Sequence, residues 1–267
     1  MAKTDNLTDF LTDIADAIRD KKGTTGAINP QDFSSEIASI ESGGVADDVH
    51  NFTGTISNTS VVGPANYTTI VINEGVITLL DNAFYNFTNV TSIYVPDTVT
   101  SIGTNVFYGC TSLTDVRLSN QIRQIMSGTF YNCSSLSSLT IPSNVFLLGT
   151  NAFRECVSLV EFIAPSNVNT IRSSVFYGCT NLRRVVFEGD IVSSMGATFF
   201  RDCTSLEVVD LSNCTSVIKL DNVSAFQNVP ATCKIIVPDT IYDSWIAATN
   251  WSTYAGRIIK KSDYDAL

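Results

Sequence analysis

Cysteines are the residues of this chain with the clearest capacity for chemistry, as disulfides, metal ligands or nucleophiles. Five of the seven recur at intervals of 23, 23, 23 and 24 residues. They are Cys110, Cys133, Cys156, Cys179 and Cys203. Identical positions in a repeat stack as a ladder, and an odd-numbered ladder offers no natural disulfide pairing. We therefore predict reduced thiols that pack as small apolar side chains, and we expect the same of Cys214 and Cys233.

No other pattern in the sequence points to catalysis. The chain has one histidine, His50, in a polar stretch, and it has no nucleophile elbow, metal-binding His/Cys set or phosphate-binding loop. The net charge of −10 argues against a nucleic-acid partner. No apolar run approaches the length of about 18 residues that a membrane-spanning helix needs. We predict a protein that is not an enzyme, uses no metal or cofactor and does not insert into membranes.

The elements that would position the cysteines repeat with them. A phenylalanine precedes each of the five by three residues, and a leucine follows each by three. A period of 23 residues is typical of leucine-rich repeats, in which each turn buries its apolar side against its neighbours. The sequence predicts a mainly β solenoid of about seven turns over residues 67–238. The strands are expected at 91–95, 114–118, 137–141, 160–164, 183–187, 207–211 and 234–237.

The two ends follow other patterns. Residues 1–42 carry two apolar stripes at helical spacing, which predict an α-helical hairpin. The stripes are Leu7, Phe10, Leu11, Ile14 and Ile18, then Phe33, Ile37 and Ile40. This hairpin could dock against another chain or fold back as the cap of the repeats. Residues 43–66 are predicted to be a linker and amino-terminal cap, and residues 239–267 a helical carboxy-terminal cap.

Alternate residues of each predicted strand point outward and form a candidate binding surface. Its most informative members are Tyr94, Arg117, Glu161, Ile163, Arg184 and Val186. A separate row of tyrosines follows the core phenylalanine of four turns, namely Tyr85, Tyr108, Tyr131 and Tyr177. Spaced tyrosines can stack on sugars, but a ladder that roofs the core is the commoner meaning.

The repeat phrases resemble those of BspA-like leucine-rich-repeat proteins. Phe107-Tyr-Gly-Cys-Thr-Ser-Leu113 and Ile102-Gly-Thr-Asn-Val-Phe107 match the repeat of that family. The resemblance implies a surface-exposed binding or adhesion module that contacts a host surface protein or glycan.

The amino-terminal run from Leu11 to Thr24, followed by Ile28-Asn-Pro-Gln-Asp-Phe33, is similar to leader segments of phage structural proteins. That second resemblance implies a virion component (fibre, tail or head decoration). It would dock on other virion proteins, or form a homo-oligomer, through residues 1–42. The alternative is a bacterial cell-surface adhesin whose export leader is missing.

Overall fold

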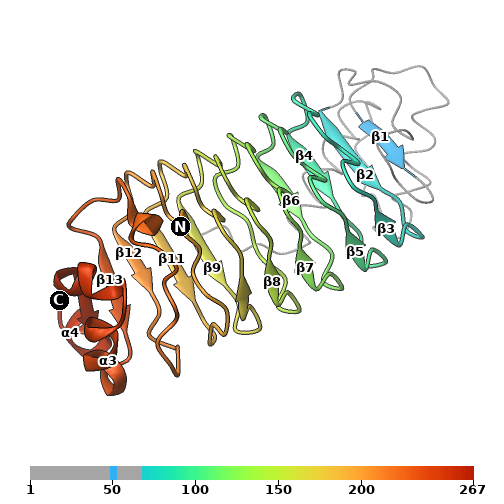
Figure 1. The fold of residues 1–267 in the computed structure, drawn as a ribbon. Helices are drawn as coiled ribbons and strands as arrows, with labels where there is room; N and C mark the ends of the chain where they lie inside the picture. The colour runs from blue at the N-terminus through green and yellow to red at the C-terminus, as the bar shows by residue number, and fades with distance from the viewer. Residues whose placement is uncertain (1–48, 53–67) are drawn as a thin grey trace.

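Short parallel strands follow the repeat period along one face of the molecule. The structure is a computed structural model that describes residues 49–52 and 68–267. Figure 1 shows an elongated body in which successive turns stack from β1 at one end to α3 and α4 at the other. The strands of this face are β1 (Val49–Phe52), β2 (Thr69–Ile72), β4 (Ser92–Tyr94), β6 (Asp115–Arg117), β9 (Glu161–Ala164), β11 (Arg184–Phe187), β12 (Val208–Asp210) and β13 (Lys234–Val237).

The face is divided into two sheets because residues 137–141 do not form a strand. One sheet has the order β1-β2-β4-β6. The other has the order β14-β13-β12-β11-β9, in which β14 is Ile258–Lys260. The predicted strand at 137–141 is therefore wrong. Its serines favour strands only weakly. Within the described chain, the backbone groups of Ser138, Leu139 and Ile141 make no backbone hydrogen bond.

A second row of two-residue strands lies along another side of the turns and is also interrupted. It consists of β3 (Thr78–Leu79) paired with β5 (Ser101–Ile102), and of β7 (Gln124–Ile125), β8 (Leu147–Leu148) and β10 (Thr170–Ile171) paired in sequence order. Within the part of the chain that the structure describes, β5 and β7 are not paired. Both strand rows are thus broken in the middle of the repeats.

Backbone hydrogen bonds along the tight turns continue where the strand rows stop. The N–H of Phe107 donates to the carbonyl of Thr129 at 2.9 Å. One turn later, the N–H of Phe130 donates to the carbonyl of Ala152 at 2.8 Å. This third side of the body therefore connects the two sheets.

The core is a column of stacked phenylalanines beside the ladder of cysteines. Phe130 lies 5.3 Å from Phe107 and 5.4 Å from Phe153 between ring centroids, in near-parallel stacks. Each of the five repeat cysteines donates its S–H to a phenylalanine carbonyl of an earlier turn, as Cys156 does to Phe130 at 3.0 Å. All seven cysteines are free and buried. The predicted packing of these thiols in the core is confirmed.

A 3-10 helix precedes β13, and further short helices and one more strand follow it. They are α3 (Tyr242–Ala247) and α4 (Lys261–Asp265), the 3-10 helices η2 (Val223–Phe226), η3 (Asp239–Ile241) and η4 (Trp251–Arg257), and β14 (Ile258–Lys260). Trp245 and Trp251 are fully buried and pack edge to face at 5.0 Å. The strand β14, which the sequence did not predict, pairs with β13 and extends the sheet.

The amino-terminal predictions lie outside the described residues. These are the helical hairpin of residues 1–42 with its eight apolar residues, and all but β1 of the linker at 43–66. In the described portion, no helix is both long and apolar enough to span a bilayer.

Candidate functional site

Outward-facing side chains of the strands form two groups, one on each side of residues 137–141. We call them the first group, on β4 and β6, and the second group, on β9 and β11. The predicted binding residues divide between them. Tyr94 and Arg117 belong to the first group, and Glu161, Ile163, Arg184 and Val186 belong to the second.

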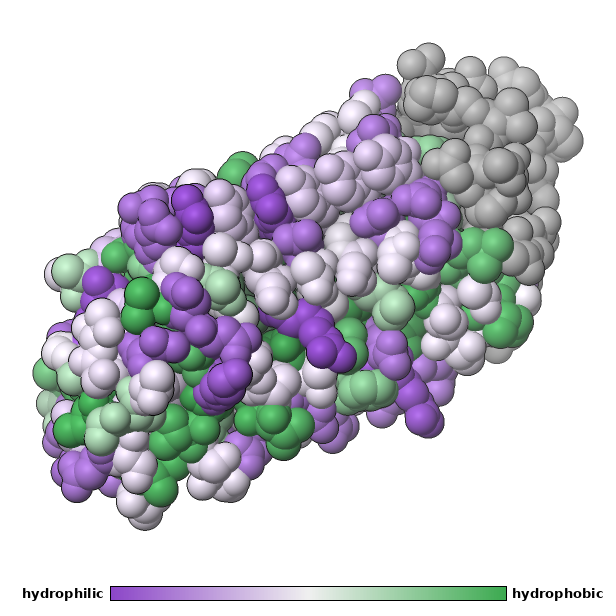
Figure 2. All heavy atoms as spheres, in the orientation of Figure 1, coloured by the Kyte–Doolittle hydropathy of each residue, from purple (hydrophilic) through white to green (hydrophobic). Residues whose placement is uncertain are grey.

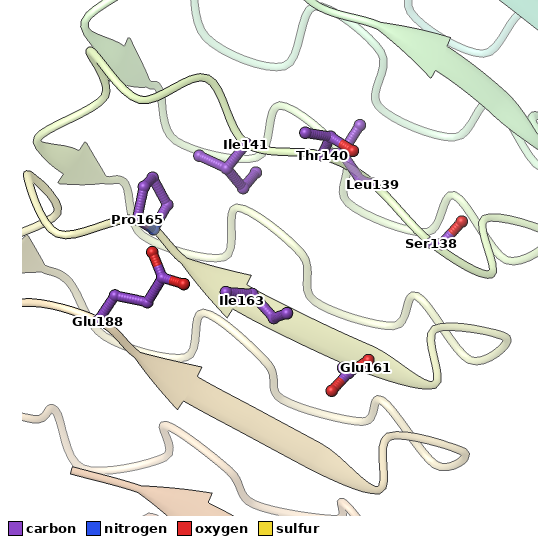
Figure 3. Close-up of a pocket in the computed structure, with 8 residues that line it drawn as sticks. All are labelled: Ser138, Leu139, Thr140, Ile141, Glu161, Ile163, Pro165 and Glu188. Atoms are coloured by element: carbon purple, nitrogen blue, oxygen red, sulfur yellow. The ribbon is translucent and has the colours of Figure 1, made fainter. Parts of the chain in front are cut away.

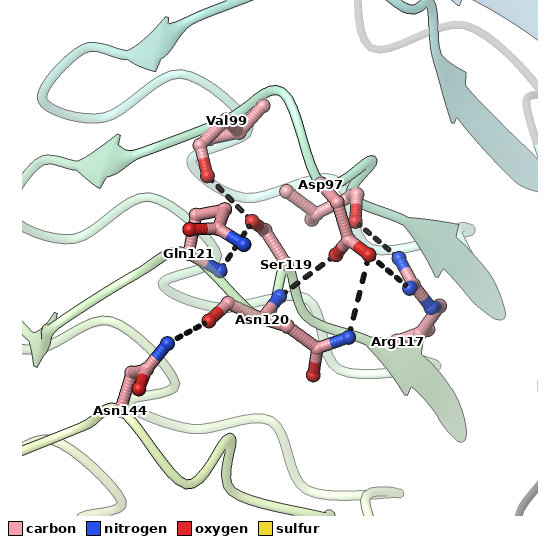
Figure 4. A network of polar contacts seen from close by, with 8 residues as sticks. Asp97, Val99, Arg117, Ser119, Asn120, Gln121 and Asn144 are labelled. Carbon is pink, nitrogen blue, oxygen red and sulfur yellow. Dashed lines mark hydrogen bonds and ion pairs between the residues drawn. The ribbon is translucent and has the colours of Figure 1, made fainter.

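The first group is an ion-paired corner between two turns (Figure 4). The guanidinium of Arg117 lies 3.0 Å from a carboxylate oxygen of Asp97 and donates to the carbonyl of Val95 at 3.1 Å. Its other contact is the ring of Tyr94, at 4.9 Å from the centroid. Asp97 also accepts the backbone N–H of Asn120 at 2.8 Å. The side-chain amide of Asn120 also donates to Asp97 at 3.3 Å, so five contacts hold Arg117 and Asp97 in one arrangement.

These contacts alter the titration of the first group. Burial is the largest influence on Asp97 and raises its pKa, but the N–H of Asn120 and the guanidinium of Arg117 together outweigh it. The pKa of the Asp97 carboxyl is therefore below its ordinary value. Burial raises the pKa of the Tyr94 hydroxyl. At neutral pH, Tyr94 is therefore a neutral phenol, and the opposite charges of Arg117 and Asp97 balance each other.

The second group combines a paired charge with an exposed aliphatic side chain. Glu161 and Arg184 lie opposite each other on β9 and β11, with 2.6 Å between their charged atoms. Ile163 is two residues along β9 and is 44% exposed. An exposed ion pair of this kind adds little to stability, about 0 to 1 kcal/mol. A charged and apolar patch of this kind suits contact with another protein.

The exposed surface ends sooner than the sequence predicted. Val186 is only 9% exposed, so the expectation of an outward binding residue at this position is wrong. The next positions in the same row, Asp210 and Ile236, are 8% and 0% exposed. The strand that carries Ile236, β13, is paired with β14 and contacted by α4. Figure 2 shows polar residues interspersed with apolar ones on the face in view, rather than one continuous apolar area.

A groove lies where the strand at 137–141 is missing (Figure 3). Its volume is about 340 Å³, and it is lined by Ser138, Leu139, Thr140, Ile141, Glu161, Ile163, Pro165 and Glu188. Figure 3 shows these side chains coming from the 138–141 segment on one side and from β9 and the end of β11 on the other. The groove adjoins the second group and shares Glu161 and Ile163 with it.

The tyrosine row is a packed ladder. Tyr85, Tyr108 and Tyr131 stack at centroid distances of 4.7 and 4.5 Å. Arg154 continues the row, lying 5.3 Å from the ring of Tyr131 and 4.2 Å from that of Tyr177. The faces of these rings contact one another or a guanidinium, which favours the structural interpretation over stacking on a sugar.

The described residues provide no group with evident catalytic chemistry. Burial raises the pKa of the Cys110 and Cys156 thiols to about 12, so they stay protonated at neutral pH. A thiol in that state is a poor nucleophile and a poor metal ligand. No cluster of three His, Cys, Asp or Glu side chains suited to a metal occurs in the described ranges, 49–52 and 68–267.

Parallel strands at a fixed period, a phenylalanine column and a strand face with mixed side chains define the leucine-rich-repeat class of proteins. The sequence matches the BspA type leucine rich repeat region over residues 54–183 and 128–245, in six copies. The chain belongs to this family, as the repeat phrases predicted.

One solved structure with a TM-score above 0.5 shares the fold. The chain is similar to a leucine-rich-repeat protein of T. pallidum with 23% identity and a TM-score of 0.57, covering 70% of this chain and 85% of that one. A leucine-rich-repeat protein of Bacteroides ovatus has 21% identity and a TM-score of 0.48, covering 71% of this chain and 47% of that one. No curated protein matches the sequence.

Sequence reasoning missed Asp97, Glu188 and the groove. One signal for Asp97 was present, because Pro96-Asp97-Thr98 recurs as Pro238-Asp239-Thr240. In both copies the aspartate accepts a backbone N–H from 23 residues later, so the phrase marks a link between turns. For the groove, the only signal was the serine-rich start of the predicted strand at 137–141.

Proposed function

We propose that this protein is a non-enzymatic binding protein that presents the strand face of its repeats to another protein. The observation that supports this most directly is the second group. Glu161, Ile163 and Arg184 place an ion pair and an exposed aliphatic side chain on a face whose backbone is held by stacked turns. A preorganised surface lowers the entropy that a partner must lose on binding. The repeats would therefore recognise a host surface protein or another subunit.

We further propose that residues 1–42 attach the protein to a larger assembly. Their two apolar stripes exceed what two short helices bury between them, so the remainder requires a partner surface. The resemblance of this segment to phage structural proteins supports a virion setting, as a fibre, tail or head-decoration component. Membership of the BspA-type family supports a second candidate, a bacterial cell-surface adhesin.

Solution mass tests the attachment proposal. Light scattering after size exclusion would compare the full chain with the variants Leu11→Asp and Ile14→Asp and with a fragment of residues 43–267. We expect a defined oligomer for the full chain and monomers for the other three. If all four are monomers, self-assembly through residues 1–42 is refuted. If the three altered proteins also lose solubility and melt at lower temperature, residues 1–42 are a cap of the repeats.

Antibody labelling decides between the two settings. An antibody raised against residues 68–267 would be applied to purified phage particles and to intact bacteria. Labelling of particles supports the virion, and labelling of intact cells without particles supports the adhesin. Enzymatic removal of surface glycans from host cells, followed by a binding assay, then distinguishes a glycan partner from a protein partner.

A further inference from the structure

The groove beside residues 137–141 has a chemistry that the rest of the strand face lacks. Its floor is aliphatic, from Leu139, Ile141 and Ile163, and Pro165 borders it. Ile163 is 44% exposed there, whereas Ile141 is buried. The described residues that line the groove include no aromatic side chain. An aliphatic surface without aromatic rings is suited to an aliphatic side chain and not to a sugar ring.

The groove also offers backbone groups that neighbouring strands normally occupy. Elsewhere on the face, parallel pairing uses these groups, as between β9 and β11. The N–H and C=O groups of Ser138, Leu139 and Ile141 have no backbone partner among the described residues. Unpaired main-chain donors and acceptors in a row are the feature by which an extended peptide is recognised.

The charge of the groove is negative and partly uncompensated. Glu161 is neutralised by Arg184 at 2.6 Å. Glu188, at the end of β11, has no ion pair or side-chain hydrogen bond to the described chain, and its carboxylate faces the groove beside Pro165. A carboxylate that lacks a cation at the rim of an apolar groove is complementary to a lysine or arginine side chain.

We propose that this groove binds an extended peptide segment that carries a lysine or arginine two residues from an aliphatic side chain. The aliphatic side chain packs on Ile163, and the cation pairs with Glu188. The main chain of the peptide bonds to the backbone groups of Ser138, Leu139 and Ile141. In an extended segment, residues two apart lie on the same side, roughly 7 Å from each other. The inference rests on the proposed function, since it assigns the place and the partner chemistry within the strand face.

A pair of synthetic peptides tests the proposal on the full chain. The probe is the acetylated and amidated hexapeptide Thr-Lys-Thr-Val-Thr-Lys, in which each lysine is two residues from the valine, and its matched control replaces both lysines by glutamate. Binding is followed by nuclear magnetic resonance of backbone amides. We expect the basic peptide to shift the signals of residues 138–141, 161–164 and 188, and the acidic peptide to leave them unchanged. Added salt should weaken the binding of the basic peptide.

Four exposed substitutions locate the interaction. Glu188→Gln should raise the dissociation constant about threefold, the size expected for an exposed ion pair, and Ile163→Ser should raise it by a similar or larger factor. Asp243→Asn in α3 and Val223→Ser in η2 are the matched controls, because Asp243 is an exposed carboxylate and Val223 is 41% exposed. Neither control should change binding.

Three outcomes overturn the proposal. The first is equal binding of both peptides, or none of either. The second is binding that Glu188→Gln and Ile163→Ser leave unchanged. The third is binding only after residues 1–42 are removed, which would mean that the chain's own amino-terminal segment fills the groove. Shifts confined to Tyr94 and Arg117 refute the groove but leave the strand face as a binding surface, so the two proposals fail separately.

Discussion

Replacement of Phe130 by alanine should uncouple the two halves of the repeat body. Both strand rows are interrupted in the middle of the chain, between β6 and β9 on the face and between β5 and β7 on the other row. Across the break in the face, the halves are still joined by the short β7-β8-β10 sheet, by stacked rings, by cysteine hydrogen bonds and by the turn ladder. Phe130 is fully buried and stacks on both Phe107 and Phe153. It is therefore the central contact of a weakened junction.

The expected loss is large. Truncating a fully buried phenylalanine to alanine costs about 3 to 5 kcal/mol of the free energy of unfolding. Loss of two aromatic stacks places Phe130→Ala toward the upper end of that range. In a repeat protein, stability depends on contacts between neighbouring turns, so a weakened junction lets each half unfold separately. Phe130→Leu keeps most of the volume and should cost less than about 1.5 kcal/mol without uncoupling.

Two optical signals in urea separate the halves. The chain has two tryptophans, Trp245 and Trp251, and both lie beyond the last repeat. Their fluorescence reports the carboxy-terminal half, whereas circular dichroism reports the whole chain. For Phe130→Ala we expect the circular dichroism midpoint to fall at lower urea than the fluorescence midpoint.

Phe176→Ala is the matched control for this experiment. Phe176 is equally buried and stacked, but it lies beside the continuous β9-β11-β12 sheet. In Phe176→Ala, the fluorescence midpoint should coincide with the circular dichroism midpoint or fall at lower urea. Coincident midpoints in Phe130→Ala would refute the idea of a weakened junction.

Three further predictions concern the same repeats. In Gly149→Ala, the new Cβ would lie 2.5 Å from the backbone nitrogen of Ser127, so the melting temperature should fall with a loss of about 1 to 3 kcal/mol, whereas Gly256→Ala, with open space around it, should be neutral. Iodoacetamide at pH 8 should leave Cys156 unmodified in the native protein and modify it in denaturant, because its pKa is about 12; native modification would contradict the buried ladder. The folded pKa of Asp97 is below its unfolded value, so its stabilisation is present above the unfolded pKa and is lost as the pH falls through the folded one. Lowering the pH should therefore destabilise the native protein more than the Asp97→Asn variant. The difference in the free energy of unfolding should be under about 1 kcal/mol because Asp97 is half exposed. Equal acid sensitivity of the two proteins would contradict a stabilising role for the Arg117–Asp97 ion pair.

The repeat period predicted the core because packing within a turn is a local property. A phenylalanine three residues before each cysteine, at a constant interval, must meet its counterpart in the next turn. Phe107, Phe130 and Phe153 do so, and the cysteines lie beside them as predicted. The same period predicted the ends of six strands to within a residue or two, namely β4, β6, β9, β11, β12 and β13.

The groove could not be predicted in this way because strand pairing depends on two neighbours at once. Residues 137–141 have the inward leucine and isoleucine of a strand, yet they pair with neither β6 nor β9. The sequence pattern also does not predict that Glu161 forms an ion pair and Glu188 does not. Ion pairing depends on which side chains the strand register places opposite each other.

The sequence by itself determined the family, the stacked turns, the buried thiols and the outward rows of the strand face. Their physical cause is a short period of apolar residues that every turn repeats. Only the tertiary structure decided where the face opens into a groove and where it is covered. Val186, Asp210 and Ile236 occupy outward positions by pattern, and all three are buried in the folded chain. Burial is set by what packs above a residue, and the elements around β13, such as β14 and α4, lie outside the repeat pattern.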